Sequence, residues 1–388
     1  MKTCGIIVEY NPFHNGHKFH IESAKKLTNS DTVIAVMSGS FVQRGEPALF
    51  NKFTRAKTAI AGGASLVIEL PFCFACAPAQ FFAEGAVRLL AATGVVDSLC
   101  FGSESGYIDS LKASPAPSDK IKKFLDKGMS YPSACAAASD TPLFTPNDIL
   151  GAEYLRAVST YAQSISCFTV KRTDGGYHSE DTVENFASAT AIRKMLGEDI
   201  IKVKDFVPPE VYEILFSEYS RGNYSDLSLL DSLVLGRLRS RMDMSTTAYV
   251  AEGLENRFYE NSLSARSIRE LAEKVKTKRY TYARLMRIIS CYMVGLTDLR
   301  LSEFIKSGPL YIRVLAANKK GRHLLSKIKD TASLPIITTP SAYKNLGKTA
   351  RDMFELDCLA SDIFALATKN PALRSGRQDF GKLNIFSD

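Results

Sequence analysis

The chain has 388 residues, 45% of them hydrophobic and 23% charged, which is enough for about two or three domains with buried cores. No apolar run approaches the roughly 20 residues of a membrane-spanning helix, and the N-terminal MKTCGIIVEY lacks the features of a signal peptide. The eight cysteines are too dilute for a disulfide framework. We therefore expect a soluble, cytoplasmic protein with reduced thiols and no membrane partner.

The formal charge of +8 is distributed unevenly along the chain. Residues 1–200 hold 19 Lys and Arg against 20 Asp and Glu, whereas residues 201–388 hold 30 against 21. A basic half of this kind indicates either an acidic polymer such as nucleic acid as partner or a solubilising surface. Composition leaves both interpretations open.

The first two hundred residues alternate short apolar runs with amphipathic stretches. The runs end in Gly, Pro or charged residues, as buried parallel strands do, and they cover residues 4–9, 32–39, 65–71, 98–104 and 164–170. This rhythm predicts a doubly wound, Rossmann-like α/β domain with a parallel sheet over residues 1–205. Pro and Ser clusters predict an insertion over residues 105–146, with loops around a short basic helix, that borders the cleft.

After Pro208 and Pro209 the spacing of apolar residues becomes helical, which predicts a mostly helical, basic domain over residues 206–388. The clearest helical stretches are residues 211–219, 229–242, 264–276 and 282–296. Residues 310–330, 334–340 and 361–368 are expected to add one or two strands. The C-terminal residues 376–388 are expected to be loosely ordered.

Histidines cluster at the first strand-to-helix turn, GIIVEYNPFHNGHKFH. Of the five in the chain, His14, His17 and His20 lie within seven residues, at the carboxyl end of the first strand, where α/β sheets bind ligands. Gly16 allows a phosphate to approach, the following helix directs unpaired N–H groups at it, and His14 and His17 can donate hydrogen bonds in the transition state. A surface turn and a metal site are the alternatives. We predict no metal site, because no carboxylate or cysteine has supporting spacing.

A second close pair, Cys73 and Cys76, stands in apolar company with no partner pair at metal-binding spacing. Buried packing is the favoured interpretation over zinc or redox chemistry.

The segment from Gly5 to His20 resembles the signature of the H-x-G-H nucleotidyltransferase superfamily. The superfamily's second signature, Ser-x-Thr-x-x-Arg at a helix start, resembles ASATAIRKML, with Ser188, Thr190 and Arg193. Hydroxyl groups there can cap the helix and bind leaving phosphates, and the arginine can clamp pyrophosphate. The alternative is an ordinary helix N-cap.

The wider pattern is more specific. VEYNPFHNGHKFH, VMSGSFVQRGEPALFNKFTRAKTAI, VIELPF, FGSE, PNDILGAEYL, ASATAIRK and KTKRYTYARLMRI together resemble bacterial tRNA(Met) cytidine acetate ligases along most of the chain. The resemblance implies activation of acetate with ATP, with Mg²⁺, to acetyl-adenylate, and transfer of the acetyl group to N4 of the wobble cytidine of elongator tRNA(Met). From the sequence we infer no protein partner.

By the same resemblance, His14 and His17 are catalytic, and the ATP site comprises Ile7, Val8, Glu9, Tyr10, Asn11, Pro12, Phe13, His14, Asn15, Gly16, His17, Lys18, Phe19, His20, Gly102, Asn147, Arg172, Ser188, Thr190 and Arg193. The residues themselves leave other interpretations open. Gly102 can be a turn glycine, Asn147 a helix N-cap, and Asp148 the side chain that contacts the nucleotide instead. Arg172 can pair with Asp174 or Glu180.

Basic residues with two interleaved tyrosines fill residues 274–288, without an acidic residue. Phosphate contacts together with stacking rings suit a single-stranded anticodon loop, so we predict tRNA binding by Lys274, Lys276, Lys278, Arg279, Tyr280, Arg284 and Arg287. A solvated helix face is the alternative. Arg44, Lys52 and Arg55 add positive charge after the second strand, where phosphate or tRNA can also be met.

Two other classes of function remain open from the sequence. A small-molecule nucleotidylyltransferase shares the α/β half but gives no reason for the basic half. A non-catalytic RNA-binding protein explains the basic half but leaves three clustered histidines without a role.

Overall fold

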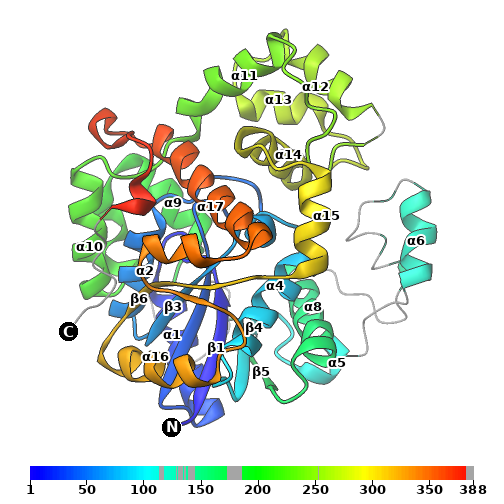
Figure 1. Ribbon diagram of the computed structural model, residues 1–388. Coiled ribbons are helices and arrows are strands. Elements are labelled where there is room, and N and C mark those ends of the chain that lie inside the picture. Colours follow the sequence, from blue (N-terminus) through cyan, green and yellow to red (C-terminus); the bar gives the residue numbers. More distant parts are fainter. Residues whose placement is uncertain are drawn as a thin grey trace.

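The structure is a computed structural model that describes residues 1–112, 118–127, 129, 134, 137–138, 145–172, 186–251 and 253–381. Its centre is a seven-stranded sheet with the order β5-β4-β1-β2-β3-β6-β7 (Figure 1). The strands are β1 (Thr3–Val8), β2 (Thr32–Ser38), β3 (Leu66–Leu70), β4 (Ser98–Ser103), β5 (Ser166–Lys171), β6 (Ile312–Ala317) and β7 (Ile336–Ile337). Neighbouring strands are parallel except for the antiparallel pair β3 and β6.

Two layers of helices cover the sheet, and side chains alternate between them along each strand. In β2, Ile34 and Val36 face one core, whereas Val33, Ala35 and Met37 face the other. The second core is closed by α1 (Asn15–Thr28), α2 (Lys52–Ala61), α9 (Ala189–Glu198), η1 (Ile200–Phe206) and α10 (Pro209–Ser220). The first is closed by α3 (Phe72–Ala75), α4 (Ala79–Ala92), α8 (Pro146–Tyr161), α16 (Lys319–Thr331) and α17 (Lys348–Leu366).

A helical region lies at the end of the molecule opposite the N-terminus (Figure 1). It contains η2 (Leu227–Leu230), α11 (Asp231–Arg239), α12 (Leu254–Ser262), α13 (Ile268–Val275) and α14 (Tyr282–Val294), and α15 (Asp298–Ser307) leads back towards the sheet. The short elements are α5 (Ile108–Lys112), α6 (Ser118–Asp126), η3 (Pro340–Asn345), η4 (Pro371–Leu373) and η5 (Gln378–Phe380).

The predicted fold class is confirmed, and all five strands expected in the first two hundred residues are present. The expected strands near the end are β6 and β7, but residues 361–368 are not a strand, because most of them belong to the long amphipathic helix α17. The basic helix expected in the insertion is α6, while most of residues 113–144 lie outside the described residues. The division of the chain at residue 205 stays a prediction, and β6 and β7 from the second part complete the sheet of the first.

The strand order reverses beside β1, since the chain continues from β1 to β2 and β3 on one side and places β4 and β5 on the other. Open α/β sheets bind ligands at such a switch point, beyond the carboxyl ends of the strands. A ligand site is therefore expected at the turns that follow β1, β4 and β5. No helix among the described residues is long and apolar enough to span a membrane.

Candidate active site

The candidate site begins where β1 turns into α1. Tyr10 has a positive φ of 48°, and the Asn11–Pro12 peptide bond is cis. The buried Tyr10 ring packs on Phe13, with ring centroids 4.7 Å apart. This sharp, buried turn places the first residues of α1 at the carboxyl edge of the sheet, and the helix packs against β4 and β5.

His14 and His17 form a reciprocal cap at the start of α1. His14 Nδ1 accepts the N–H of Gly16 at 3.1 Å, and His17 Nδ1 accepts the N–H of His14 at 3.2 Å. The two rings stack with centroids 3.7 Å apart. Because Nδ1 is an acceptor in both rings, each neutral imidazole carries its proton on Nε2. The turn therefore presents two Nε2–H donors with fixed orientation.

This arrangement differs from the expected cradle of unpaired backbone N–H groups. The N–H of Gly16 is taken by His14, and the N–H groups of His17 and Lys18 bond the His14 carbonyl at 2.9 and 3.2 Å. The imidazole at the N-cap supplies the acceptor that a phosphate would otherwise provide. An anion at this turn would thus meet the two imidazoles and the helix dipole. Gly16 also serves packing, because a Cβ there would lie 2.9 Å from His14 Cε1.

The three clustered histidines are neutral at pH 7. Burial, and then the positive charge of Arg172, lowers the pKa of His14 to about 4 and that of His20 to about 4. Burial, followed by the neighbouring His14 and Arg172, holds the pKa of His17 well below 6.5. A neutral imidazole at this turn can donate a hydrogen bond but carries no permanent positive charge. In the described part of the chain, the buried His20 Nε2 has no hydrogen-bond partner.

Gly102 and Arg172 lie together at the ends of two neighbouring strands. Gly102 is inside β4 and is not a turn residue, and the N–H of Arg172 donates to the Ser103 carbonyl at 2.8 Å. A Cβ at position 102 would lie 3.2 Å from Arg172 Cγ, so glycine leaves room for the arginine side chain. Arg172 forms no ion pair with a described residue, and the alternative partners Asp174 and Glu180 lie outside the described residues.

Asn147 lies in the first turn of α8, whose N-cap is Thr145, so the alternative interpretation of Asn147 as the N-cap is wrong. The Asn147 amide donates to Glu104 at 2.6 Å, and Glu104 also accepts the N–H of Asp148 at 3.0 Å. The buried Asp148 accepts in turn from Ser105 Oγ at 3.1 Å. Asp148 is thus turned inward, and none of the described residues donates a hydrogen bond to the Asn147 amide oxygen.

Glu104 and Ser105 were missed by sequence reasoning. They follow FGS at the end of β4, and this polar pair directly after a buried strand was the available signal. Their hydrogen bonds attach the start of α8 to the turn after β4, which fixes the position of Asn147 at the sheet edge.

The second signature folds against the first, although about 180 residues separate them. Ser188 caps α9 by accepting the N–H of Ala191 at 3.2 Å. Arg193 Nη2 donates to Thr190 Oγ1 at 3.0 Å, and Arg193 Nη1 donates to the Asn11 carbonyl at 2.8 Å. Ser188 is therefore an N-cap, as the alternative interpretation held, and the same helix start lies beside the turn that carries His14.

Two other residues of the range 7–20 bond to distant segments of the protein. Asn15 donates to the Asp205 carbonyl at 2.9 Å, and Lys18 pairs with Glu210 at 2.9 Å. These bonds hold the start of α1 against η1 and α10. A direct contact of Asn15 or Lys18 with ATP stays a prediction.

The residues predicted to bind tRNA are not presented as one surface. Lys274 and Lys276 each pair with a glutamate one turn earlier, at 2.9 and 3.3 Å. Arg287 is partly buried in α14, and its Nη1 donates to the Gln43 carbonyl at 3.3 Å. These three cations thus have protein partners that reduce their availability to phosphate.

The other four residues of the prediction are in the segment between α13 and α14 or in the first turn of α14. They are Lys278, Arg279, Tyr280 and Arg284. The guanidinium groups of Arg284 and Arg279 lie 4.9 and 5.9 Å from the centre of the Tyr280 ring, and Lys278 is exposed. Tyr280 packs partly on the core and orients the two arginines. This group is the part of the segment that fits the tRNA-binding prediction.

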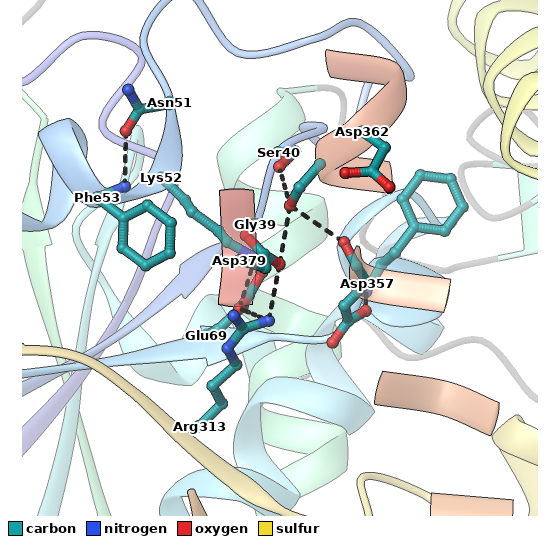
Figure 2. Close-up of polar contacts among 12 residues, drawn as sticks. Gly39, Ser40, Asn51, Lys52, Phe53, Glu69, Arg313, Asp357, Asp362 and Asp379 are labelled. Carbon is teal, nitrogen blue, oxygen red and sulfur yellow. Dashed lines mark hydrogen bonds and ion pairs between the residues drawn. The ribbon is translucent and has the colours of Figure 1, made fainter. Parts of the chain in front are cut away.

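Lys52 and Arg55 do not meet an external phosphate, contrary to expectation, because both are fully buried. Lys52 bridges Glu69 at 2.8 Å and Asp379 at 2.7 Å, and Arg313 pairs with the same two carboxylates at 3.1 Å each (Figure 2). We call Lys52, Glu69, Arg313 and Asp379 the buried charge cluster.

The C-terminal segment was expected to be loosely ordered, and for its described part this is wrong. Asp379 is 1% exposed on η5 because it balances the charges of Lys52 and Arg313. Cys73 and Cys76 are free and buried, as the packing interpretation requires. Among the described residues no group of three or more His, Cys, Asp or Glu side chains is placed to hold a metal ion.

Comparison with known proteins gives consistent results. The model of the family described as HIGH Nucleotidyl Transferase matches residues 1–379. The tRNA(Met) cytidine acetate ligase of Acetivibrio thermocellus is 39% identical, with 98% of each chain covered. That of Caldanaerobacter subterraneus subsp. tengcongensis is 40% identical, covering 96% of this chain and 97% of the relative. The crystal structure of Thermotoga maritima TmcAL bound with alpha-thio ATP superposes with a TM-score of 0.91 at 35% identity, covering 100% of this chain and 99% of that one.

Proposed function

Because the chain belongs to the family of tRNA(Met) cytidine acetate ligases, we propose that it activates acetate with ATP and transfers the acetyl group to N4 of the wobble cytidine of elongator tRNA(Met). The observation that carries this proposal is the convergence of the two signatures, since Arg193 bonds the Asn11 carbonyl at 2.8 Å. This bond brings a cation and a helix start beside the two imidazoles. Such an arrangement suits a reaction in which a triphosphate is cleaved.

In the first step, an acetate oxygen attacks the α-phosphorus of ATP and pyrophosphate leaves. The Nε2–H groups of His14 and His17 donate to the phosphoryl oxygens as negative charge builds on them. Pre-positioned donors of this kind typically lower the barrier by a few kcal/mol each. Because the stacked rings are held by backbone hydrogen bonds at Nδ1, they need little reorganisation when the charge develops.

Three other groups assist the same step. Arg172 adds positive charge beside the imidazoles, as its effect on their pKa values indicates. Arg193 and the hydroxyl groups of Ser188 and Thr190 receive the leaving pyrophosphate at the start of α9. Gly102 and Asn147 border the nucleotide at the ends of β4 and α8.

Magnesium fits this site as an ion that accompanies the triphosphate. Mg²⁺ in such sites takes few ligands from the protein and most from phosphate oxygens and water. When bound, it would neutralise part of the triphosphate charge.

In the second step, the N4 amine of the cytidine attacks the acetyl carbonyl, the bond to AMP breaks, and the amine proton leaves to solvent or to the departing phosphate. The protein's main contribution is to hold the two reactants together, because orientation alone can supply a large part of the barrier reduction. Lys278, Arg279 and Arg284 around Tyr280 are proposed to hold the tRNA strand.

The test is to incubate the protein with ATP, radiolabelled acetate and unmodified tRNA(Met). Label is expected in tRNA as N4-acetylcytidine, with one AMP released per acetyl group. A tRNA with uridine at the wobble position is the matched control and should remain unlabelled. Acetate-dependent pyrophosphate exchange without labelled tRNA would contradict the assignment of the acceptor, and no ATP consumption would favour a non-catalytic RNA-binding protein.

A further inference from the structure

The segment after β2 forms a tight turn at residues 42–46, which we call the 42–46 turn. The Val42 N–H donates to the Glu46 carbonyl at 3.0 Å, and the Gly45 N–H donates to the Val42 carbonyl at 2.8 Å. Gly45 has a φ of +83°, which favours glycine at this position. The turn exposes Arg44. Its backbone bonds make it a rigid platform for that side chain.

One flank of the turn is attached to the residues around the first signature. Glu9 Oε1 accepts the N–H of Gln43 at 2.8 Å. Further along, Asn11 Oδ1 accepts the N–H of Leu49 at 2.7 Å, and the Asn11 carbonyl is the group that Arg193 bonds. Arg44 is therefore next in sequence to a residue fixed to the end of β1.

The other flank is attached to α14, the helix that carries Arg284. Arg287 Nη1 donates to the Gln43 carbonyl at 3.3 Å, and Ser290 Oγ donates to the Gly45 carbonyl at 2.6 Å. A Cβ at Gly45 would lie 2.3 Å from the backbone nitrogen of Arg287, so the two backbones are in direct contact. Through its N–H and its carbonyl, the backbone of Gln43 thus connects Glu9 on one side with Arg287 on the other.

Arg44 is an exposed cation within electrostatic range of Arg193. Arg44 is close enough to Arg193 to lower the pKa of that guanidinium, after the larger effect of burial and against the opposing effects of Glu46 and Glu9. Within the described residues Arg44 forms no ion pair, and the half-buried Glu9 accepts the Gln43 N–H. Arg44 and Arg193, from separate segments, are therefore within electrostatic range of each other and of Glu9 and Glu46, and among the described residues Arg44 forms an ion pair with neither carboxylate.

We propose that Arg44 binds a backbone phosphate of the tRNA next to the cytidine that is acetylated. This inference rests on the proposed function, and it adds a substrate-binding residue outside both signatures and outside the basic segment. The cytidine amine has to reach an adenylate held at the His14 turn, while the strand is held at α14. The 42–46 turn joins these two places, so a phosphate of the entering nucleotide must pass close to it.

The experiment compares Arg44→Ala and Arg44→Lys with the wild-type protein in two assays. Steady-state acetylation at varied tRNA gives the KM for tRNA, and acetate-dependent ATP–pyrophosphate exchange without tRNA reports adenylate formation. Arg221→Ala is the matched control, because its guanidinium is also exposed but lies at the end of α10. The melting temperature of each variant is measured to check folding.

We expect Arg44→Ala to raise the KM for tRNA by roughly tenfold or more, as loss of a charged hydrogen bond implies. The rate of ATP–pyrophosphate exchange should change much less. The KM of Arg44→Lys for tRNA should lie between those of the wild type and Arg44→Ala, and the KM of Arg221→Ala should equal that of the wild type. The dependence of log affinity on log salt should become shallower by roughly 0.7 to 0.9 units.

Three results separate the possibilities. An unchanged KM for tRNA in Arg44→Ala would overturn the inference. Loss of exchange with unchanged tRNA binding would also overturn it, since Arg44 would then serve the ATP phosphates. A wild-type protein that labels no tRNA would contradict the proposed function itself, and this inference would fail with it.

Discussion

Asp379 is expected to make a large contribution to stability, although it lies only nine residues before Asp388. Its Oδ2 accepts from Lys52 at 2.7 Å, from Arg313 at 3.1 Å and from Ser361 at 3.1 Å (Figure 2). Burial raises the pKa of Asp379, but the charges of Lys52 and Arg313 outweigh it and hold the pKa below its usual value. The side chain is therefore ionised. Asp379→Asn preserves its size and removes its charge.

The expected loss in the free energy of unfolding follows from the charges that remain in the buried charge cluster. In Asp379→Asn, Lys52 and Arg313 share the single carboxylate of Glu69, and all three side chains are at most 4% exposed. Removing one partner of a buried ion pair typically costs about 3–5 kcal/mol, because the other charge stays buried without compensation. At about 2 cal/mol/K of unfolding entropy per residue, this corresponds to a melting temperature about 4–6 °C lower for a chain of 388 residues.

Thermal unfolding followed by far-UV circular dichroism measures this shift, since the chain has no tryptophan for fluorescence. Asp362→Asn is the matched control, because Asp362 belongs to α17 nearby and accepts a single backbone N–H, from Arg377 at 2.6 Å. The control should lower the free energy of unfolding by about 1 kcal/mol. Equal melting temperatures for Asp379→Asn and Asp362→Asn would refute the reasoning. The pair Lys52→Met with Asp379→Leu should restore part of the stability, since a buried ion pair can often be replaced by apolar residues.

The remaining predictions concern the active site and the tRNA-binding residues. His17→Ala should reduce acetate-dependent pyrophosphate exchange by roughly a hundredfold, with a smaller change in ATP affinity, because the donor acts on charge that develops in the transition state; full exchange would exclude a catalytic role. His14, with a folded pKa of about 4 against 6.5 unfolded, contributes stability that is present above pH 6.5 and is lost as pH falls towards 4. Denaturant titrations should therefore show His14→Gln gaining about 2 kcal/mol relative to wild type between pH 7.5 and pH 5; a pH-independent difference would contradict this. Replacing Lys278, Arg279 and Arg284 together by Ala should weaken tRNA binding. The slope of log affinity against log salt should become shallower by roughly 0.7 to 0.9 for each lost phosphate contact. Unchanged binding would indicate that these residues only form a solvated helix face.

The central strands could be predicted because their residues repeat local rules. Apolar runs such as TVIAVMS need no distant partner to be recognised, since a strand covered on both faces is apolar throughout. The turn with His14, Gly16 and His17 was equally visible, because three histidines and a glycine after a strand are a local feature. The position of this turn at the sheet edge followed from the chain order of strands and helices.

The partners of the charged residues could not be predicted in the same way. In the sequence, Lys52 and Arg55 look like the exposed cations Arg44 and Lys57, yet the first two are fully buried. Whether a lysine meets water or a carboxylate depends on which segments the fold brings beside it, and Asp379 lies 327 residues away from Lys52.

The same reason explains the C-terminal segment and the basic helix. Glycine, serine and charged residues near Asp379 are typical of a disordered tail. Two buried cations that otherwise share the single carboxylate of Glu69 make the ordering of this segment favourable. In the sequence, Arg287 resembles one more cation of a nucleic-acid-binding surface. In the fold, its guanidinium donates to the Gln43 carbonyl. Local patterns establish which segments form strands, helices and the histidine turn, whereas the neutralisation of each charge depends on contacts between distant segments, which form only when the chain is folded.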